Sequence, residues 1–193
     1  MELGLWRLEE IVELVRRDIE FRVPMCRGIK IAVESEDSLF IDARGVPQPI
    51  RSSCIDHAMR MLSAYLYRYA KVVVKNVCSD RGCRARVVEI PTLLAAGDKL
   101  SKTIAFAALT RVLYDYGYVD SLLLEALAKL VSRARARIDG GKAVVEVEKS
   151  SDVERLLRIL ETKRMARIVR MDSDRIVFEI DRRIVEWFSR DIG

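Results

Sequence analysis

The stretch that decides the fold class is residues 133–148, Arg-Ala-Arg-Ala-Arg-Ile-Asp-Gly-Gly-Lys-Ala-Val-Val-Glu-Val-Glu. With the two glycines as a tight turn, it forms an antiparallel hairpin in which Arg135 faces Glu146 and Arg133 faces Glu148. The other face is then entirely apolar, and a shift of one residue would spoil both faces. We therefore predict a salt-bridged structural hairpin in preference to an arginine-faced ribbon that binds nucleic acid.

The alternation of helix and hairpin continues to the C-terminus. The elements expected there are a helix at 152–163, a hairpin of strands 167–171 and 175–180, and a helix at 182–189. A turn at Ser173 and Asp174 would place Met171 opposite Ile176, which is a sensible register for a hairpin.

The first half of the chain shows the same alternation. The elements expected there are a helix at 5–21, strands 29–33 and 38–42, a helix from Ser52 or Ser53 to 69, and strands 71–77 and 84–90. Residues 91–100 contain Pro91, Gly97 and Asp98 and mark a break. Two helices rich in Leu and Ala follow at 103–116 and 119–131, the first with Ser101 as its expected N-cap.

These patterns predict an α+β fold: antiparallel β-hairpins, each preceded by a helix, around a central helical pair. An N-terminal α+β region (1–90) and a C-terminal helical and hairpin region (101–193) would meet near 91–100, with one compact domain as the alternative. Helix followed by hairpin recurs, but the copies share little sequence identity, so the repeat is a pattern of elements and no proven duplication.

The composition predicts a soluble, cytoplasmic protein without a membrane partner. The chain has 193 residues, of which 50% are hydrophobic and 33% charged, and no apolar run reaches the roughly 18 residues of a transmembrane helix. Residues 1–22 interleave acids and bases too densely for a signal peptide. A single Asn (Asn76) and a single Gln (Gln48) beside 34 basic and 29 acidic residues indicate a hyperthermophilic archaeon or bacterium.

The four cysteines admit three interpretations. Cys54 and His57 are three apart on an expected helix, and Cys78 and Cys83 flank a tight loop, so these four could bind structural zinc. Cys78 and Cys83 also lie opposite each other across their hairpin, which favours a disulfide, and Cys26 could then pair with Cys54. Free buried thiols are the third interpretation. We favour the disulfide and expect no cofactor other than structural zinc.

The C-terminal part carries a resemblance to a known family. Residues 150–161, followed by 166–170 and 175–180, resemble the last part of a winged-helix domain, in which a recognition helix precedes a two-stranded wing. The resemblance implies contact with nucleic acid. The basic side chains concentrated in this segment include Arg155, Arg158, Arg164, Arg167 and Arg170.

The function predicted from the sequence is a non-enzymatic accessory or regulatory protein that binds DNA or RNA phosphates through these arginines. The alternative is a protein-interaction or oligomerisation subunit with no nucleic-acid contact. An enzyme is the less favoured class, because the chain has one histidine (His57) and no convincing Ser-His-Asp or Cys-His arrangement. The net charge of +5 permits nucleic-acid binding without requiring it.

Overall fold

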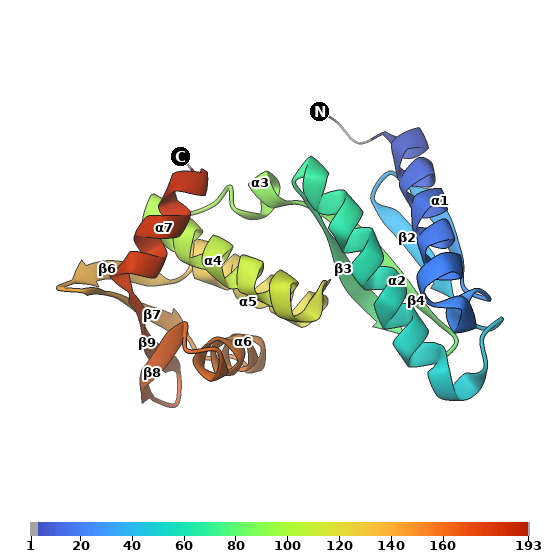
Figure 1. Cartoon of the computed structure of the whole chain (residues 1–193). Coiled ribbons are helices and arrows are strands. Elements are labelled where there is room, and N and C mark those ends of the chain that lie inside the picture. The colour runs from blue at the N-terminus through green and yellow to red at the C-terminus, as the bar shows by residue number, and fades with distance from the viewer. Residues whose placement is uncertain (1–3, 193) are drawn as a thin grey trace. The chain divides into compact units, whose positions relative to one another are not determined.

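The computed structural model describes residues 4–192 and separates into two compact units. The N-terminal unit comprises the chain through Ile90 together with Asp115–Ser121, and the C-terminal unit comprises Pro91–Tyr114 and the chain from Leu122. Helices and antiparallel-rich sheets make up both units (Figure 1), so the predicted α+β class is confirmed. Among residues 4–192, no helix has the length and apolar character needed to cross a membrane.

The N-terminal unit consists of two helix–hairpin segments and one added strand. Its elements are α1 (Leu5–Arg22), β1 (Lys30–Ser35), β2 (Ser38–Asp42), α2 (Arg51–Leu66), β3 (Lys71–Cys78), β4 (Gly82–Glu89) and β5 (Val119–Asp120), with 3-10 turns at Pro24–Cys26, Gln48–Ile50 and Tyr67–Tyr69. The strand order is β1-β2-β4-β3-β5, and only the pair of β3 and β5 is parallel. Helices α1 and α2 cover one face of this sheet (Figure 1), where Leu39 and Ile41 are fully buried.

The rest of the chain continues the same architecture. Its elements are α3 (Ile90–Leu93), α4 (Lys99–Tyr116), α5 (Ser121–Ser132), β6 (Arg135–Asp139), β7 (Lys142–Glu148), α6 (Ser151–Thr162), β8 (Ala166–Met171), β9 (Arg175–Asp181) and α7 (Arg182–Ile192). The second sheet has the order β6-β7-β9-β8 and is antiparallel throughout. Val153, Leu156, Leu157 and Leu160 of α6 are buried, as are the alternate residues of β7 and β9.

The two sheets share one connectivity. In each, a helix leads into a hairpin, a second helix leads into a second hairpin, and the second strands of the two hairpins pair in the middle. The order β1-β2-β4-β3 is therefore equivalent to β6-β7-β9-β8. The winged-helix resemblance is not confirmed, because the hairpin of β6 and β7 precedes α6 and its strands share one four-stranded sheet with β8 and β9.

The predicted hairpin registers are confirmed where the strands pair, but the expected pairing of Arg133 with Glu148 is not formed, because β6 begins at Arg135. Arg135 lies opposite Glu146 across a two-residue turn, and Gly140 has the positive φ of 60° that such a turn favours. Met171 lies opposite Ile176 in the second hairpin. Alternation of apolar residues on one face therefore fixed both pairings.

The predicted helix starts differ from the structure for α2, α4 and α5. α5 begins at Ser121 and not at residue 119, because Val119 and Asp120 form strand β5 against β3. α2 begins at Arg51, one residue before the predicted serines, and has no side-chain cap. α4 begins at Lys99, and the carboxylate of Asp98 accepts hydrogen bonds from the Ser101 backbone N–H at 2.9 Å and from the Ser101 hydroxyl at 3.1 Å. Asp98 thus satisfies the free amide of the first turn, which removes the need for Ser101 as the cap.

Candidate nucleic-acid interface

The five predicted arginines lie on consecutive elements of the C-terminal unit. Arg155 and Arg158 project from the exposed side of α6, Arg164 lies in the turn after that helix, and Arg167 and Arg170 lie on β8. All five side chains belong to exposed residues. The structure therefore keeps the predicted set within one helix–strand segment.

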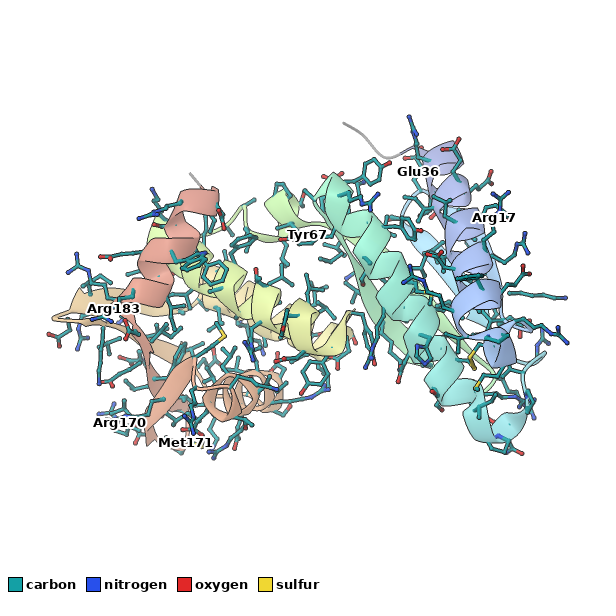
Figure 2. The ribbon with its side chains drawn as sticks, in the orientation of Figure 1. Arg17, Glu36, Tyr67, Arg170, Met171 and Arg183 are labelled. Atoms are coloured by element: carbon teal, nitrogen blue, oxygen red, sulfur yellow. A yellow bond between two sulfur atoms is a disulfide. The ribbon has the colours of Figure 1, made fainter. Side chains whose placement is uncertain are left out.

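The set nevertheless divides between two surfaces. α6 packs its apolar side on one face of the sheet and turns Arg155 and Arg158 away from it. Arg167 lies opposite Glu179 and Arg170 opposite Val177, both on the other face of the sheet. We call that second surface, which α6 does not cover, the open face. Figure 2 shows Arg170 on the side of β8 away from α6.

A β-bulge brings Arg167 and Arg170 to the same face. They are three residues apart, so in a regular strand they would point to opposite faces. The register shifts between Ile168 and Arg170, and Val169 is the extra residue. The bulge restores Arg170 to the open face, which is the way bulges redirect side chains at sheet edges.

Further cations lie on the open face beside these two. Arg135 and Arg137 project from edge strand β6, Lys142 from β7 and Arg175 from β9. Two cross-strand rows organise the centre of the face. One row reads Arg135, Glu146, Val177, Arg170, and the other reads Arg137, Val144, Glu179, Arg167.

The two rows are related by an approximate two-fold axis between β7 and β9. Read from β8 instead of β6, the second row has the same order as the first: Arg, Glu, Val, Arg. Residues 135–148 and 167–181 thus share one pattern once Val169 is set aside. Both inner strands also have identical burial patterns.

Carboxylates neutralise part of this surface. Arg175 bonds Glu146, Lys142 bonds Glu179 at 2.7 Å, and Arg170 pairs with Asp172 at 2.9 Å. The hydrogen bond from Arg175, with the nearby charges of Arg135 and Arg170, lowers the pKa of Glu146. On β8, Arg167 lies 3.8 Å from Glu179 of β9. On α6, Arg158 lies 3.8 Å from Glu154 and 3.3 Å from Glu161.

The predicted salt bridges of the first hairpin are not formed. Arg135 faces Glu146 as expected, but Glu146 accepts its hydrogen bond from Arg175 of β9 instead. Among residues 4–192, Arg135, Arg137 and Arg164 make no ion pair within 4.0 Å. The sequence analysis weighed an arginine-faced ribbon here and set it aside in favour of salt bridges within one hairpin, whereas the second hairpin supplies a competing cation.

A cavity of about 620 Å³ lies at the end of the sheet next to the turn between β6 and β7. Its charged lining consists of Lys142, Arg164, Arg167, Asp139, Glu161, Glu179 and Asp181. Cations and carboxylates are therefore mixed in the cavity lining. One of these carboxylates, Glu161, accepts a hydrogen bond from the backbone amide of Ile168 at 3.2 Å. This lining adds Arg164 to the cations near the open face.

The cysteines form two disulfides. Cys26 is joined to Cys54 with Cα atoms 5.4 Å apart, and Cys78 to Cys83 with Cα atoms 4.1 Å apart. The predicted disulfides are thus present, and the free-thiol interpretation is wrong. The structure does not support zinc at Cys54, His57, Cys78 and Cys83, because the sulfurs are bonded to each other and residues 4–192 hold no metal-binding group of His, Cys, Asp and Glu.

A second polar cluster lies in the N-terminal unit. Asp56 of α2 accepts hydrogen bonds from the Tyr118 hydroxyl at 3.0 Å and from Lys75 of β3 at 3.2 Å. Burial, and then the hydrogen bond to Asp56, raise the pKa of Tyr118 to about 12. A phenol held protonated in this way is a poor general base, and the cluster instead ties the segment before β5 to α2 and β3.

No protein-family model, no curated protein and no solved structure matches the chain.

Proposed function

We propose that this protein is a non-enzymatic, nucleic-acid-associated accessory protein of a hyperthermophile's cytoplasm. Its C-terminal unit would bind DNA or RNA phosphates through Arg155, Arg158, Arg164, Arg167 and Arg170, largely without reading sequence. The observation that carries the proposal is the concentration of five exposed arginines on the segment from α6 to β8.

Arg164 is a position where local stability alone favours another residue. It has a φ of 57°, in the left-handed region that favours glycine, directly after the end of α6. An arginine there costs roughly 1 kcal/mol relative to glycine. Residues that are unfavourable for their local backbone conformation tend to occur at functional sites. The Arg164 guanidinium also makes no ion pair with the described residues.

The ion pairs of the other arginines do not prevent phosphate binding. The side chains of Arg158, Arg167 and Arg170 are 57%, 71% and 62% exposed. Exposed ion pairs contribute little, because water screens both charges. A phosphate can therefore replace a carboxylate on these guanidinium groups at small cost.

The experiment is fluorescence anisotropy of labelled single- and double-stranded DNA and RNA at low and moderate salt. Binding through phosphates predicts that log K falls linearly with log salt, by roughly 0.7 to 0.9 per phosphate neutralised. Arg155→Glu/Arg158→Glu should weaken binding with the fold intact by circular dichroism. Absence of binding at low salt would contradict the proposal.

Arg164→Gly separates stability from binding. Glycine relieves the left-handed backbone and should raise the unfolding midpoint slightly, whereas loss of the guanidinium should weaken nucleic-acid binding. Ala70 has the same backbone conformation, with a φ of 55°. Ala70→Gly is therefore the matched control, which should raise stability and leave binding unchanged.

The alternative function, a protein-interaction subunit, is favoured by α7. Trp187 is 72% exposed on that helix, although Val185 beside it is buried and Phe188 contacts Phe106 with ring centroids 5.9 Å apart. Exposed tryptophan is enriched at protein interfaces. A concentration-dependent mass in analytical ultracentrifugation, abolished by Trp187→Ala, together with no nucleic-acid binding, would favour this alternative.

A further inference from the structure

We infer that the open face binds a double-stranded nucleic acid across a groove, with the β6 arginines on one phosphate backbone and the β8 arginines on the other. The inference rests on the proposed function, because it names the class of nucleic acid and adds residues to the site. It assigns a binding role to Arg135 and Arg137, and it makes Arg167 and Arg170 their counterparts on the opposite edge.

The dimensions of the face suit a groove. Three strand spacings separate β6 from β8, which places the two edges about 14 Å apart. The major groove of B-DNA is about 12 Å wide and admits two strands at most. A four-stranded sheet is too wide to enter, so it would lie over the groove with its edge strands near the two backbones.

The arginines on each edge have a regular spacing. Arg135 and Arg137 are alternate residues of β6, hence about 7 Å apart along the strand. The bulge at Val169 gives Arg167 and Arg170 the same spacing in cross-strand rows, because both lie opposite alternate residues of β9. Each edge therefore presents two guanidinium groups in line.

The symmetry of the face matches that of a duplex. β6 and β8 run in opposite directions, since three antiparallel pairings separate them. The approximate two-fold axis between β7 and β9 exchanges these edges and their arginines. The two backbones of a duplex are also antiparallel and related by a local two-fold axis, and proteins commonly match such symmetry.

The centre of the face disfavours a single strand. Its two rows carry Glu146 and Val177, and Val144 and Glu179, between the outer arginines. Lys142 and Arg175 pair with Glu179 and Glu146, but Glu148 and Asp181 add two carboxylates at the ends of the same strands. A backbone that follows the middle of the sheet therefore meets net negative charge. Single-strand binders also use aromatic side chains as stacking platforms, and the central positions of these rows hold none.

The β6 arginines can bind phosphates without first breaking an ion pair. Arg135 and Arg137 make no ion pair with residues 4–192, whereas Arg167 and Arg170 each have a carboxylate within 4.0 Å. Phosphate contacts by Arg135 and Arg137 therefore displace no protein partner. Their removal should affect affinity at least as strongly as removal of the β8 pair.

The test compares neutral double variants by fluorescence anisotropy, using a duplex DNA, a duplex RNA and the matching single strands. Arg135→Gln/Arg137→Gln and Arg167→Gln/Arg170→Gln should each weaken duplex binding by tenfold or more and reduce the salt slope by about two. Arg84→Gln/Arg86→Gln is the matched control, because these exposed arginines have the same spacing on inner strand β4. It should leave binding unchanged.

A second variant tests the central carboxylates. Glu146→Gln/Glu179→Gln should strengthen single-strand binding more than duplex binding, because repulsion at the centre is removed. Circular dichroism of each variant establishes that the fold is retained.

The outcomes distinguish this inference from the proposed function. Equal binding of single strands and duplexes would overturn the inference, as would loss of binding in Arg155→Glu/Arg158→Glu with the two edge variants unchanged; the proposed function would survive either result. Failure to bind any nucleic acid would overturn both. Duplex preference with loss in both edge variants would support the inference and nucleic-acid binding by this unit, and additional loss in Arg155→Glu/Arg158→Glu would support the full set of residues in the proposed function.

Discussion

The two sheets share a connectivity but are stabilised and decorated differently. The N-terminal sheet gains a fifth strand, β5, on the edge of β3, and both disulfides lie in its unit. In the C-terminal sheet the edge strands β6 and β8 have one strand partner each among the described residues, and both carry arginines. Charged edges also prevent unwanted strand pairing.

The two sheets also differ in the side chains on the face that their helices leave uncovered. In the N-terminal sheet Phe40 lies opposite Ala32 and Arg84, and its ring covers Gly82, where an added Cβ would meet the ring at 2.9 Å. In the C-terminal sheet the equivalent rows consist of arginine, glutamate and valine. The N-terminal sheet thus places an aromatic ring beside Arg84, whereas the two central rows of the C-terminal sheet hold no aromatic side chain.

The largest expected effect comes from the disulfide between Cys26 and Cys54. It closes a loop with a sequence separation of 28, and removing such a link costs about 3 kcal/mol through greater entropy of the unfolded chain. Cys26→Ala/Cys54→Ala should therefore reduce hydrogen-exchange protection of α2, whereas protection of α6 stays unchanged. Equal loss in both helices would show that the units unfold together.

The C-terminal unit depends instead on an ion pair between helices. Lys129 of α5 lies 3.1 Å from Asp152 of α6, whose side chain is 5% exposed. Asp152→Asn should cost about 2 kcal/mol, because it leaves the lysine without its charged partner in a partly buried site. Denaturant unfolding measures the loss, and Asp174→Asn, in an exposed turn, is the control.

The same pair predicts a pH dependence. Burial opposes ionisation of Asp152, but hydrogen bonds from Ser150 and Lys129 outweigh it and lower the pKa of the carboxyl. A lowered pKa stabilises the fold above the ordinary pKa of aspartate, near 4, and that contribution is lost as pH falls through the lower folded value. Asp152→Asn should remove this part of the acid sensitivity in unfolding experiments at decreasing pH.

Sequence reasoning predicted local structure better than the site. The alternation in residues 133–148 was sufficient for the register of Arg135 with Glu146, because only one register buries the apolar residues. The same alternation could not predict the ion pairs. Arg175, which bonds Glu146 in place of Arg135, lies on β9, and the pairing of β9 with β7 depends on tertiary packing.

The relation between the two C-terminal hairpins was missed for a specific reason. The pattern of residues 135–148 recurs in 167–181 only when Val169 is set aside as a bulge. One inserted residue reverses the face of the side chains before it. When alternate residues are assigned to alternate faces, Arg167 and Arg170 therefore do not align with Arg135 and Arg137. The pairing of Cys78 with Cys83, by contrast, followed from their position across one hairpin and is confirmed.

A smaller effect is expected at the attachment of β5 to the N-terminal sheet. Tyr118→Phe removes the hydrogen bond to Asp56 but leaves Lys75 as a partner of that carboxylate, so the loss is about 1 kcal/mol. In the intact protein, the raised pKa of Tyr118 predicts stability that is full below pH 10 and declines between pH 10 and about 12. Tyrosinate absorbance during an alkaline titration reports this group, and Tyr114→Phe, 80% exposed, is the control.

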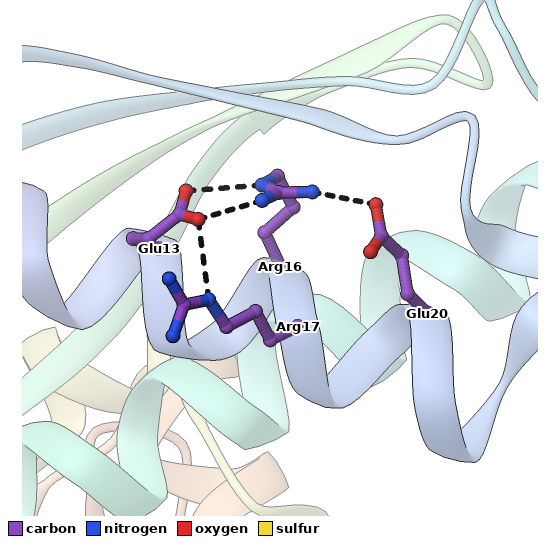
Figure 3. A network of polar contacts seen from close by, with 4 residues as sticks. All are labelled: Glu13, Arg16, Arg17 and Glu20. Carbon is purple, nitrogen blue, oxygen red and sulfur yellow. Dashed lines mark hydrogen bonds and ion pairs between the residues drawn. The ribbon is translucent and has the colours of Figure 1, made fainter.

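The smallest effect is expected for the exposed ion-pair network of α1 (Figure 3). Arg16 bonds Glu13 at 2.6 Å and Glu20 at 2.6 Å, and Arg17 bonds Glu13 at 3.4 Å. The hydrogen bond from Arg16 lowers the pKa of Glu13, yet all these groups are in water, where such pairs contribute little and are screened by salt. Arg16→Ala should therefore shift the unfolding midpoint slightly at low salt and not at high salt.

Arg158→Ala on α6 removes a similar pair of contacts and should have the same small effect on stability. The two variants differ in what they predict for binding, because Arg158 belongs to the proposed phosphate site and Arg16 does not. Reduced nucleic-acid affinity in Arg158→Ala alone would show that equivalent surface networks differ in function. A large, salt-independent loss of stability in either variant would contradict the view that these charges are exposed and weakly coupled to the fold.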